Sequence, residues 1–178
     1  MKKYLRVIPL CIYPYAYLLF ILFLILTSKE YNDDFFMDAA LCVAVAYNIF
    51  VVFFVIYNAF VTAGDRYDLK TVAIMNLVIK GVQIPAYIFH FIIGFFGTLM
   101  SVWGIGLIMF VIIIDFITIT LTGINSIGCS VKMYRDGAIS KAKAVFMGIG
   151  CFIYCIDIVI ALAYVIKAVA ASGKRKTI

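Results

Sequence analysis

Five long apolar segments alternate with short polar connections along the chain. They cover residues 7–27, 35–62, 72–96, 104–126 and 144–166. Each is close to or above the ~20 residues that a helix needs to cross the hydrocarbon core of a bilayer. The pattern predicts an all-α integral membrane bundle of five transmembrane helices, with residues 1–178 forming a single transmembrane domain.

Polar residues recur at helical intervals within the third segment. They step by three or four positions, as Asn76, Lys80, Gln83, Tyr87 and His90. This spacing places them on one face of a helix. Because lipid does not accommodate Lys or His in the body of a span, we expect this face to point at protein or water.

Two aspartates also fall inside apolar segments, Asp115 in the fourth and Asp157 in the fifth. The predicted helices put both near the middle of the membrane, where Lys80 can reach. Asn48 and Gln83 complete this candidate polar layer. A lone charge at mid-bilayer costs at least ~2.5–3.5 kcal/mol on insertion scales. We therefore expect Lys80 to pair with one aspartate and the other to be protonated or hydrogen-bonded.

The layer has two interpretations. It is either an ion- or proton-coupled site, or polar contact that only holds helices together. Three residues are secondary candidates. His90 lies about three turns outward from Lys80 and is either a titrating gate or a packing histidine. Asn76 lies one turn before Lys80, and Thr118 follows Asp115 on a second polar stripe.

No signature of an enzyme, cofactor or metal site is present. The chain has one histidine, so histidine-based metal clusters are excluded. No P-loop, nucleophile elbow or paired-cysteine motif occurs. The five cysteines lie in or beside apolar segments, and we interpret them as buried apolar side chains. We expect no enzymatic activity, no cofactor and no bound metal.

Charge is sparse and concentrated at segment ends. Only 13% of residues are charged, against roughly a quarter in soluble domains. The net charge of +6 is therefore not interpreted as a sign of nucleic-acid binding. We expect the positive residues to set the orientation of the protein in the membrane and to contact anionic lipid headgroups, above all at the basic loop 129–143.

The distribution of Lys and Arg predicts a cytoplasmic N-terminus, with the loops 63–71 and 129–143 on the same side. Five crossings then put the C-terminal tail outside. That tail is basic, with Lys167, Lys174, Arg175 and Lys176. The tail is thus an exception to the positive-inside tendency.

Two stretches carry a resemblance to a known family. They are MNLVIKGVQIPAYIF (Met75 to Phe89) and ITLTGINSIGCSVKMYRDGAISK (Ile119 to Lys141). With the apolar helix that follows, they resemble an uncharacterised family, a domain of unknown function, of small multi-pass membrane proteins from clostridial Gram-positive bacteria. The resemblance implies a multi-pass protein of the bacterial plasma membrane and offers no catalytic residues.

We therefore expect a small polytopic membrane protein, with transport or ion coupling through the polar layer as the sharpest hypothesis. The alternative is a non-transporting accessory, regulatory or immunity-type membrane protein that binds a partner helix. The expected partners are the bilayer and either further copies of the chain or another membrane protein.

Overall fold

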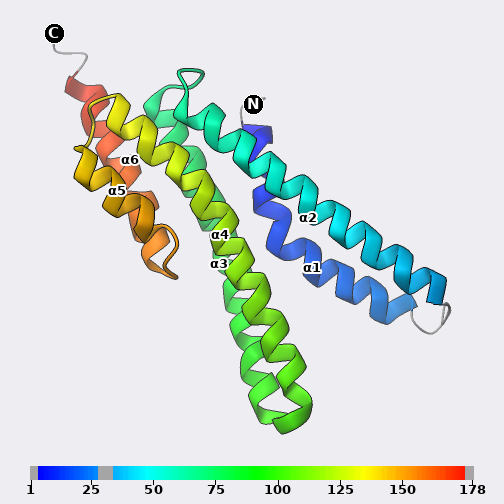
Figure 1. Cartoon of the computed structure of the whole chain (residues 1–178). Helices are drawn as coiled ribbons and strands as arrows, with labels where there is room; N and C mark the ends of the chain where they lie inside the picture. The colour runs from blue at the N-terminus through cyan, green and yellow to red at the C-terminus, as the bar shows by residue number, and fades with distance from the viewer. Residues whose placement is uncertain (1–3, 28–33, 175–178) are drawn as a thin grey trace.

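The computed structural model describes residues 4–27 and 34–174, and this part of the chain is helical without a strand (Figure 1). The elements are η1 (Tyr4–Val7), α1 (Ile8–Thr27), α2 (Asp34–Ala63), α3 (Leu69–Leu99), η2 (Ser101–Gly104), α4 (Ile105–Arg135), α5 (Lys141–Gly150) and α6 (Ile156–Lys174). The all-α prediction is confirmed for these residues. The predicted outer loop 28–35 falls mostly on residues outside the described ranges.

Two long helical hairpins form the frame of the molecule. One consists of α1 and α2, the other of α3 and α4, and they diverge away from the end that holds the chain termini (Figure 1). The hairpins meet closely where Gly128 of α4 faces α2. A Cβ atom at Gly128 would lie 2.2 Å from Thr62 Oγ1 and 2.5 Å from the Ala59 carbonyl oxygen. This glycine therefore permits the close approach of α2 and α4.

The predicted fifth helix, 144–166, is wrong as a single element. The chain leaves the helix at Gly150 and turns through residues 151–155 before α6 begins. Cys155 takes a left-handed backbone conformation with φ 66°, which a continuous right-handed helix does not allow. The two helices approach closely at Gly150, where a Cβ atom would lie 2.4 Å from the Ile160 side chain.

The fold-back brings the end of α6 beside the start of α3. Tyr164 and Ala168 of α6 share a buried apolar cluster with Leu69 and Val72 of α3 and with Met133 of α4. A second cluster joins the two hairpins through side chains of α1, α2, α3 and α4, including Leu10, Tyr13, Val51, Met75 and Leu121. The core is thus divided into two parts that meet on the α3–α4 hairpin.

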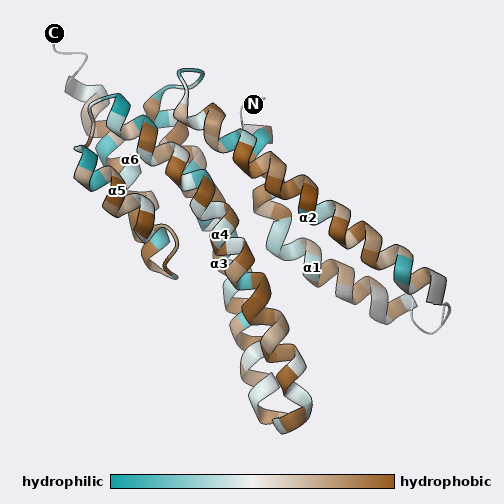
Figure 2. Ribbon diagram, viewed as in Figure 1, coloured by the Kyte–Doolittle hydropathy of each residue, from teal (hydrophilic) through white to brown (hydrophobic). Residues whose placement is uncertain are grey.

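Basic residues gather at the end of the molecule where η1 lies beside the connections α2–α3 and α4–α5, and we call this region the basic end. The Arg6 guanidinium lies 6.0 Å from the centre of the Tyr67 ring. Lys132 Nζ lies 3.0 Å from Asp65 Oδ1 and 3.1 Å from Asp136 Oδ1. Hydrophilic residues concentrate at this end, while long stretches of the helices are hydrophobic (Figure 2).

Local chemistry explains where the two central helices begin and end. α3 begins after Asp68, whose carboxylate accepts a hydrogen bond from the Thr71 amide at 3.0 Å, as expected of an N-cap. α4 runs nine residues beyond the predicted 104–126 and ends at Arg135, just before Gly137. There the Ala138 amide donates to the Met133 carbonyl, and Gly137 has φ 71°, which forms a Schellman ending.

Four helical segments of the described chain are long and apolar enough to cross a membrane. They are Asp38–Ala63, Leu69–Leu99, Ser101–Arg135 and Ile156–Gly173. Their outward faces carry large exposed apolar side chains such as Phe53, Phe91 and Phe116. These properties suit a membrane-embedded protein in contact with lipid. Five crossings and the cytoplasmic N-terminus stay predictions.

Candidate functional site

The α3–α4 hairpin fixes the register of the polar side chains between its helices. At its tip, a Cβ atom on Gly104 would lie 1.7 Å from the Gly97 carbonyl oxygen, so only glycine fits this contact. Residues at similar distances from the tip then face each other across the hairpin. Asn76 and Ser126 are one such pair, and the Ser126 hydroxyl donates to Asn76 Oδ1 at 2.8 Å.

Lys80 and Asp157 form a fully buried ion pair. Lys80 Nζ lies 2.8 Å from Asp157 Oδ2, and the two side chains are 0% and 1% exposed. Lys80 also donates to Thr122 Oγ1 at 2.7 Å, and the Thr122 hydroxyl donates onward to the Thr118 carbonyl at 2.9 Å. The charge of Lys80 is therefore compensated by groups from α4 and α6.

The break between α5 and α6 delivers Asp157 to this position. Asp157 lies in the first turn of α6, where the helix dipole favours a negative charge. Its Oδ1 accepts a hydrogen bond from the Ile158 amide at 2.9 Å. A continuous helix over 144–166 would carry Asp157 past this level, so the turn at residues 151–155 is what aligns the carboxylate with Lys80.

His90 and Asp115 form a second acid–base pair, separate from the first. His90 Nδ1 lies 2.5 Å from Asp115 Oδ1. The histidine side chain is 0% exposed and the aspartate is 19% exposed. His90 Nε2 is buried and has no hydrogen-bond partner among the described residues. This pair thus combines a buried base with a carboxylate that reaches the protein surface.

The single layer predicted from the sequence is therefore divided. Lys80 and Asp157 meet, but Asp115 pairs with His90 instead of joining them. The reason is the length of α4, which places Asp115 in the half of the helix nearer the hairpin tip. The second aspartate was expected to be protonated or hydrogen-bonded, and its carboxylate contacts His90.

The remaining predicted residues lie around these pairs. The Gln83 amide donates to the Leu10 carbonyl at 3.3 Å, and the Tyr87 hydroxyl donates to Gln83 Oε1 at 3.4 Å. Asn48 lies away from Lys80 and accepts a hydrogen bond from the Tyr13 hydroxyl at 2.8 Å. These residues link α3 and α2 to α1 instead of completing the charged layer.

Thr118 and Asn76 have local roles. The Thr118 hydroxyl donates to the Ile114 carbonyl within α4 at 2.7 Å. Asn76 pairs with Ser126 as described, and its Nδ2 is buried with no hydrogen-bond partner in the described chain. Both side chains are buried, at 0% and 1% exposure. They extend the polar seam along the α3–α4 interface.

Several buried polar contacts were missed by the sequence analysis. Asn58 Nδ2 donates to Asn125 Oδ1 at 2.6 Å, which joins α2 to α4. The hydroxyls of Ser130 and Tyr164 contact each other, and Cys151 Sγ lies 3.8 Å from the Tyr164 hydroxyl. Equal distance from the hairpin tip is a signal that would have found Thr122 opposite Lys80. No comparable signal exists for contacts made by α6.

The described residues contain no evident metal-binding site. Among residues 4–27 and 34–174, no group of three or more His, Cys, Asp or Glu side chains lies close enough to hold an ion. The carboxylate of Asp115 and the imidazole of His90 are in contact, and such a pair can share a proton.

Comparisons with known proteins assign neither a family nor a function to the chain. No protein-family model matches the chain, and no match is found among curated proteins or solved structures. The resemblance to clostridial membrane proteins therefore stays an expectation, and function has to be argued from the chain's own residues.

Proposed function

We propose that this chain is a multi-pass membrane protein with four crossings, formed by α1 to α4, and a re-entrant hairpin formed by α5 and α6. α6 is long enough to cross, but it begins beside Lys80, midway along α3, and Ala168 lies beside Leu69 at the start of α3, so α6 turns back toward the basic end. α5 has 10 residues, about 15 Å, which is half the ~30 Å hydrocarbon core. The fold-back also returns Lys167 and Lys174 to the side of the other basic connections, as the positive-inside tendency favours.

The basic end is cytoplasmic in this proposal. It contains Arg6, the connection 64–68 and the connection 136–140, each on or beside basic residues. The tip of the α3–α4 hairpin then lies at the opposite surface, with Trp103 89% exposed there. Tryptophan is enriched at membrane–water interfaces, which agrees with this orientation.

The function that the geometry supports best is proton coupling through the pair formed by His90 and Asp115. The single observation that carries it is the contact between His90 and Asp115. A buried imidazole touches a carboxylate that is 19% exposed, so the two groups are placed to share a proton. Histidine is the side chain whose ordinary titration falls near physiological pH.

The two pairs have different roles in this proposal. When His90 is protonated, its charge compensates Asp115. When His90 is neutral, Asp115 keeps an uncompensated charge in apolar surroundings, which is costly. Protonation of His90 therefore lowers the electrostatic cost of keeping the charged Asp115 in the membrane. Lys80 and Asp157 form a separate buried pair nearer the basic end. This pair holds α6 against α3 in both protonation states of His90.

Proton movement across liposomes containing the purified protein tests the proposal. A potassium diffusion potential drives protons inward, and a trapped pH-sensitive dye reports their entry. We expect Asp115→Asn and His90→Gln to lower the rate to that of protein-free liposomes. Asp38→Asn, a matched change at an exposed carboxylate of α2, should keep the original rate. An unchanged rate in Asp115→Asn would contradict the proposal.

The alternative, a non-transporting accessory protein that binds a partner helix, has its own supporting observation. An apolar groove of about 650 Å³ lies between the hairpins, lined by Leu18 and Leu22 of α1, Phe89 of α3 and Phe110 of α4, among others. A photo-reactive residue at Leu22 would cross-link to a partner in native membranes. Such a cross-link, together with no proton movement, would favour this alternative.

A further inference from the structure

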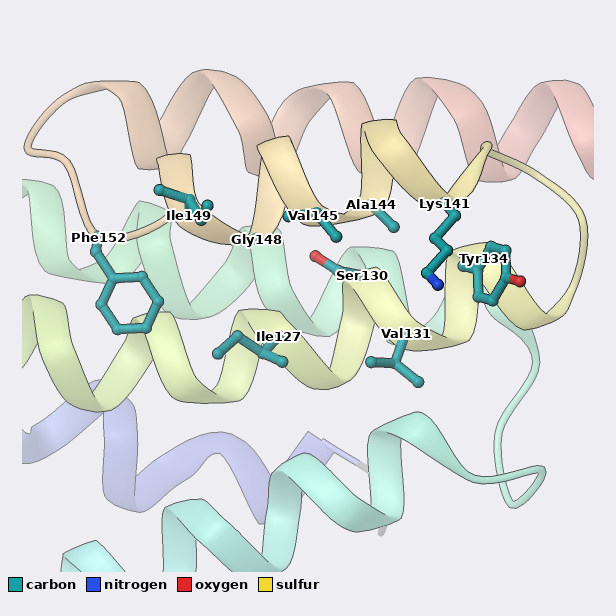
Figure 3. A pocket seen from close by; sticks show the side chains of 10 residues that line it. All are labelled: Ile127, Ser130, Val131, Tyr134, Lys141, Ala144, Val145, Gly148, Ile149 and Phe152. Atoms are coloured by element: carbon teal, nitrogen blue, oxygen red, sulfur yellow. The ribbon is translucent and has the colours of Figure 1, made fainter.

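A second apolar groove runs along the outside of the re-entrant hairpin, between α4 and α5. We call it the α4–α5 groove, and it has a volume of about 550 Å³. Its walls are apolar side chains of both helices, and its floor contains the small residues Ser130 and Gly148 (Figure 3). Phe152 lies at one end, and Lys141 and Tyr134 lie at the other (Figure 3).

The groove has the dimensions of one leaflet. It follows α5 from Lys141 to the turn at Phe152, and this helix of 10 residues is about 15 Å long. That length is half of the ~30 Å hydrocarbon core, which is the depth reached by a lipid chain in a single leaflet. The groove therefore begins at the headgroup level of the basic end and finishes near the middle of the bilayer.

Charge at the mouth of the groove is uncompensated. Lys141 makes no ion pair with any described residue, and its amine is directed toward the groove (Figure 3). By contrast, the neighbouring Lys132 and Arg135 are both paired with Asp65. A single free ammonium above an apolar slot suits a ligand with an anionic head and a long apolar tail.

We propose that the α4–α5 groove binds one acyl chain of an anionic phospholipid from the leaflet at the basic end, with the lipid phosphate held by Lys141. A partner helix is a poorer fit, because its apolar face provides no counter-ion for Lys141, whereas the phosphate of an anionic lipid does. This proposal rests on the proposed membrane topology but not on proton coupling.

Retention of lipid in neutral detergent tests the proposal, because the anionic bilayer is then gone and only specific contacts remain. The protein is reconstituted with equal amounts of phosphatidylglycerol and phosphatidylcholine, extracted, and examined intact by native mass spectrometry. We expect one retained phosphatidylglycerol per chain. Lys141→Gln should lower its retention about tenfold, as the loss of a charged hydrogen bond does. Lys143→Gln, the same change on an exposed residue of α5 outside the groove, should not.

A second pair of variants tests the apolar part. Ala144→Trp fills the groove and should remove the retained phosphatidylglycerol, whereas Ala142→Trp, on an exposed position outside it, should keep it bound. Thermal unfolding in detergent confirms that each variant is folded. Equal retention of the two lipids, or equal loss in Lys141→Gln and Lys143→Gln, would overturn the proposal. Failure here leaves the proton assay unaffected, so the two proposals are distinguished.

Discussion

Replacing Asp157 with asparagine is the sharpest test of the buried ion pair. The change keeps the size of the side chain but leaves the charge of Lys80, which is 0% exposed, with Thr122 as its remaining hydrogen-bond partner. Removing one member of a buried pair typically costs about 3–5 kcal/mol. Lys80→Met should cost a similar amount, because it leaves the buried Asp157 carboxylate without its counter-ion.

The double variant Lys80→Met, Asp157→Asn should recover much of this loss. It contains no buried charge, and apolar replacement of a whole buried pair is often close to neutral. We expect its free energy of unfolding to lie within about 2 kcal/mol of the original protein, which corresponds to a coupling of more than about 3 kcal/mol between the two residues.

The assay is reversible unfolding in mixed micelles, followed by circular dichroism as the fraction of denaturing detergent increases. Lys167→Met serves as the control, because it makes the same substitution at an exposed position of α6. If Asp157→Asn is no more destabilising than Lys167→Met, or if the two single effects simply add, then the pair does not hold α6 in place and the reasoning is refuted.

Three further predictions concern packing and charge. Gly128→Val should destabilise the protein by about 1–3 kcal/mol, measured in the same unfolding assay, since its Cβ would lie 2.2 Å from Thr62 Oγ1; an unchanged stability would mean that α2 and α4 do not approach this closely. Gly137→Ala should cost about 1–2 kcal/mol, because φ is 71° there, and a stabilised variant would contradict that backbone conformation. The hydrogen bond from Lys132 holds the pKa of Asp65 below its usual range. The stabilisation by Asp65 is therefore present above the unfolded pKa of about 4 and is lost as pH falls through the lower folded value. The thermal midpoint of Asp65→Asn should accordingly fall less steeply than that of the original protein below about pH 4, and identical curves would argue against the contact.

Hydrophobic patterning was sufficient to predict the helices of both long hairpins. Residues 35–62 and 72–96 correspond closely to α2 and α3, because each segment is bounded by polar residues, and Asp68 caps α3 as its sequence indicates. The fifth segment failed because nothing in its composition marks the turn. Cys155 takes a conformation normally favoured by glycine. The misplaced positive charge of the tail was the only signal that the chain folds back.

The candidate site was predicted in its residues but not in its pairing. Lys80, Asp115, Asp157 and His90 were all identified, since buried ionisable groups in apolar segments are conspicuous. Their partners depend on helix register. The register of α3 against α4 follows from the short hairpin at Gly97 and Gly104, whereas the position of α6 depends on a turn that the sequence does not reveal.

The two acid–base pairs can form at different stages of protein synthesis. His90 and Asp115 are 25 residues apart on helices joined by a tight turn, so both are available almost as soon as α4 leaves the ribosome. Lys80 has to wait until α4 and α5 have been made before Asp157 emerges. During that interval α3 carries an uncompensated charge that resists burial. α6 is therefore the helix that allows α3 to settle fully, so the contact between these two helices completes only after α6 has been made.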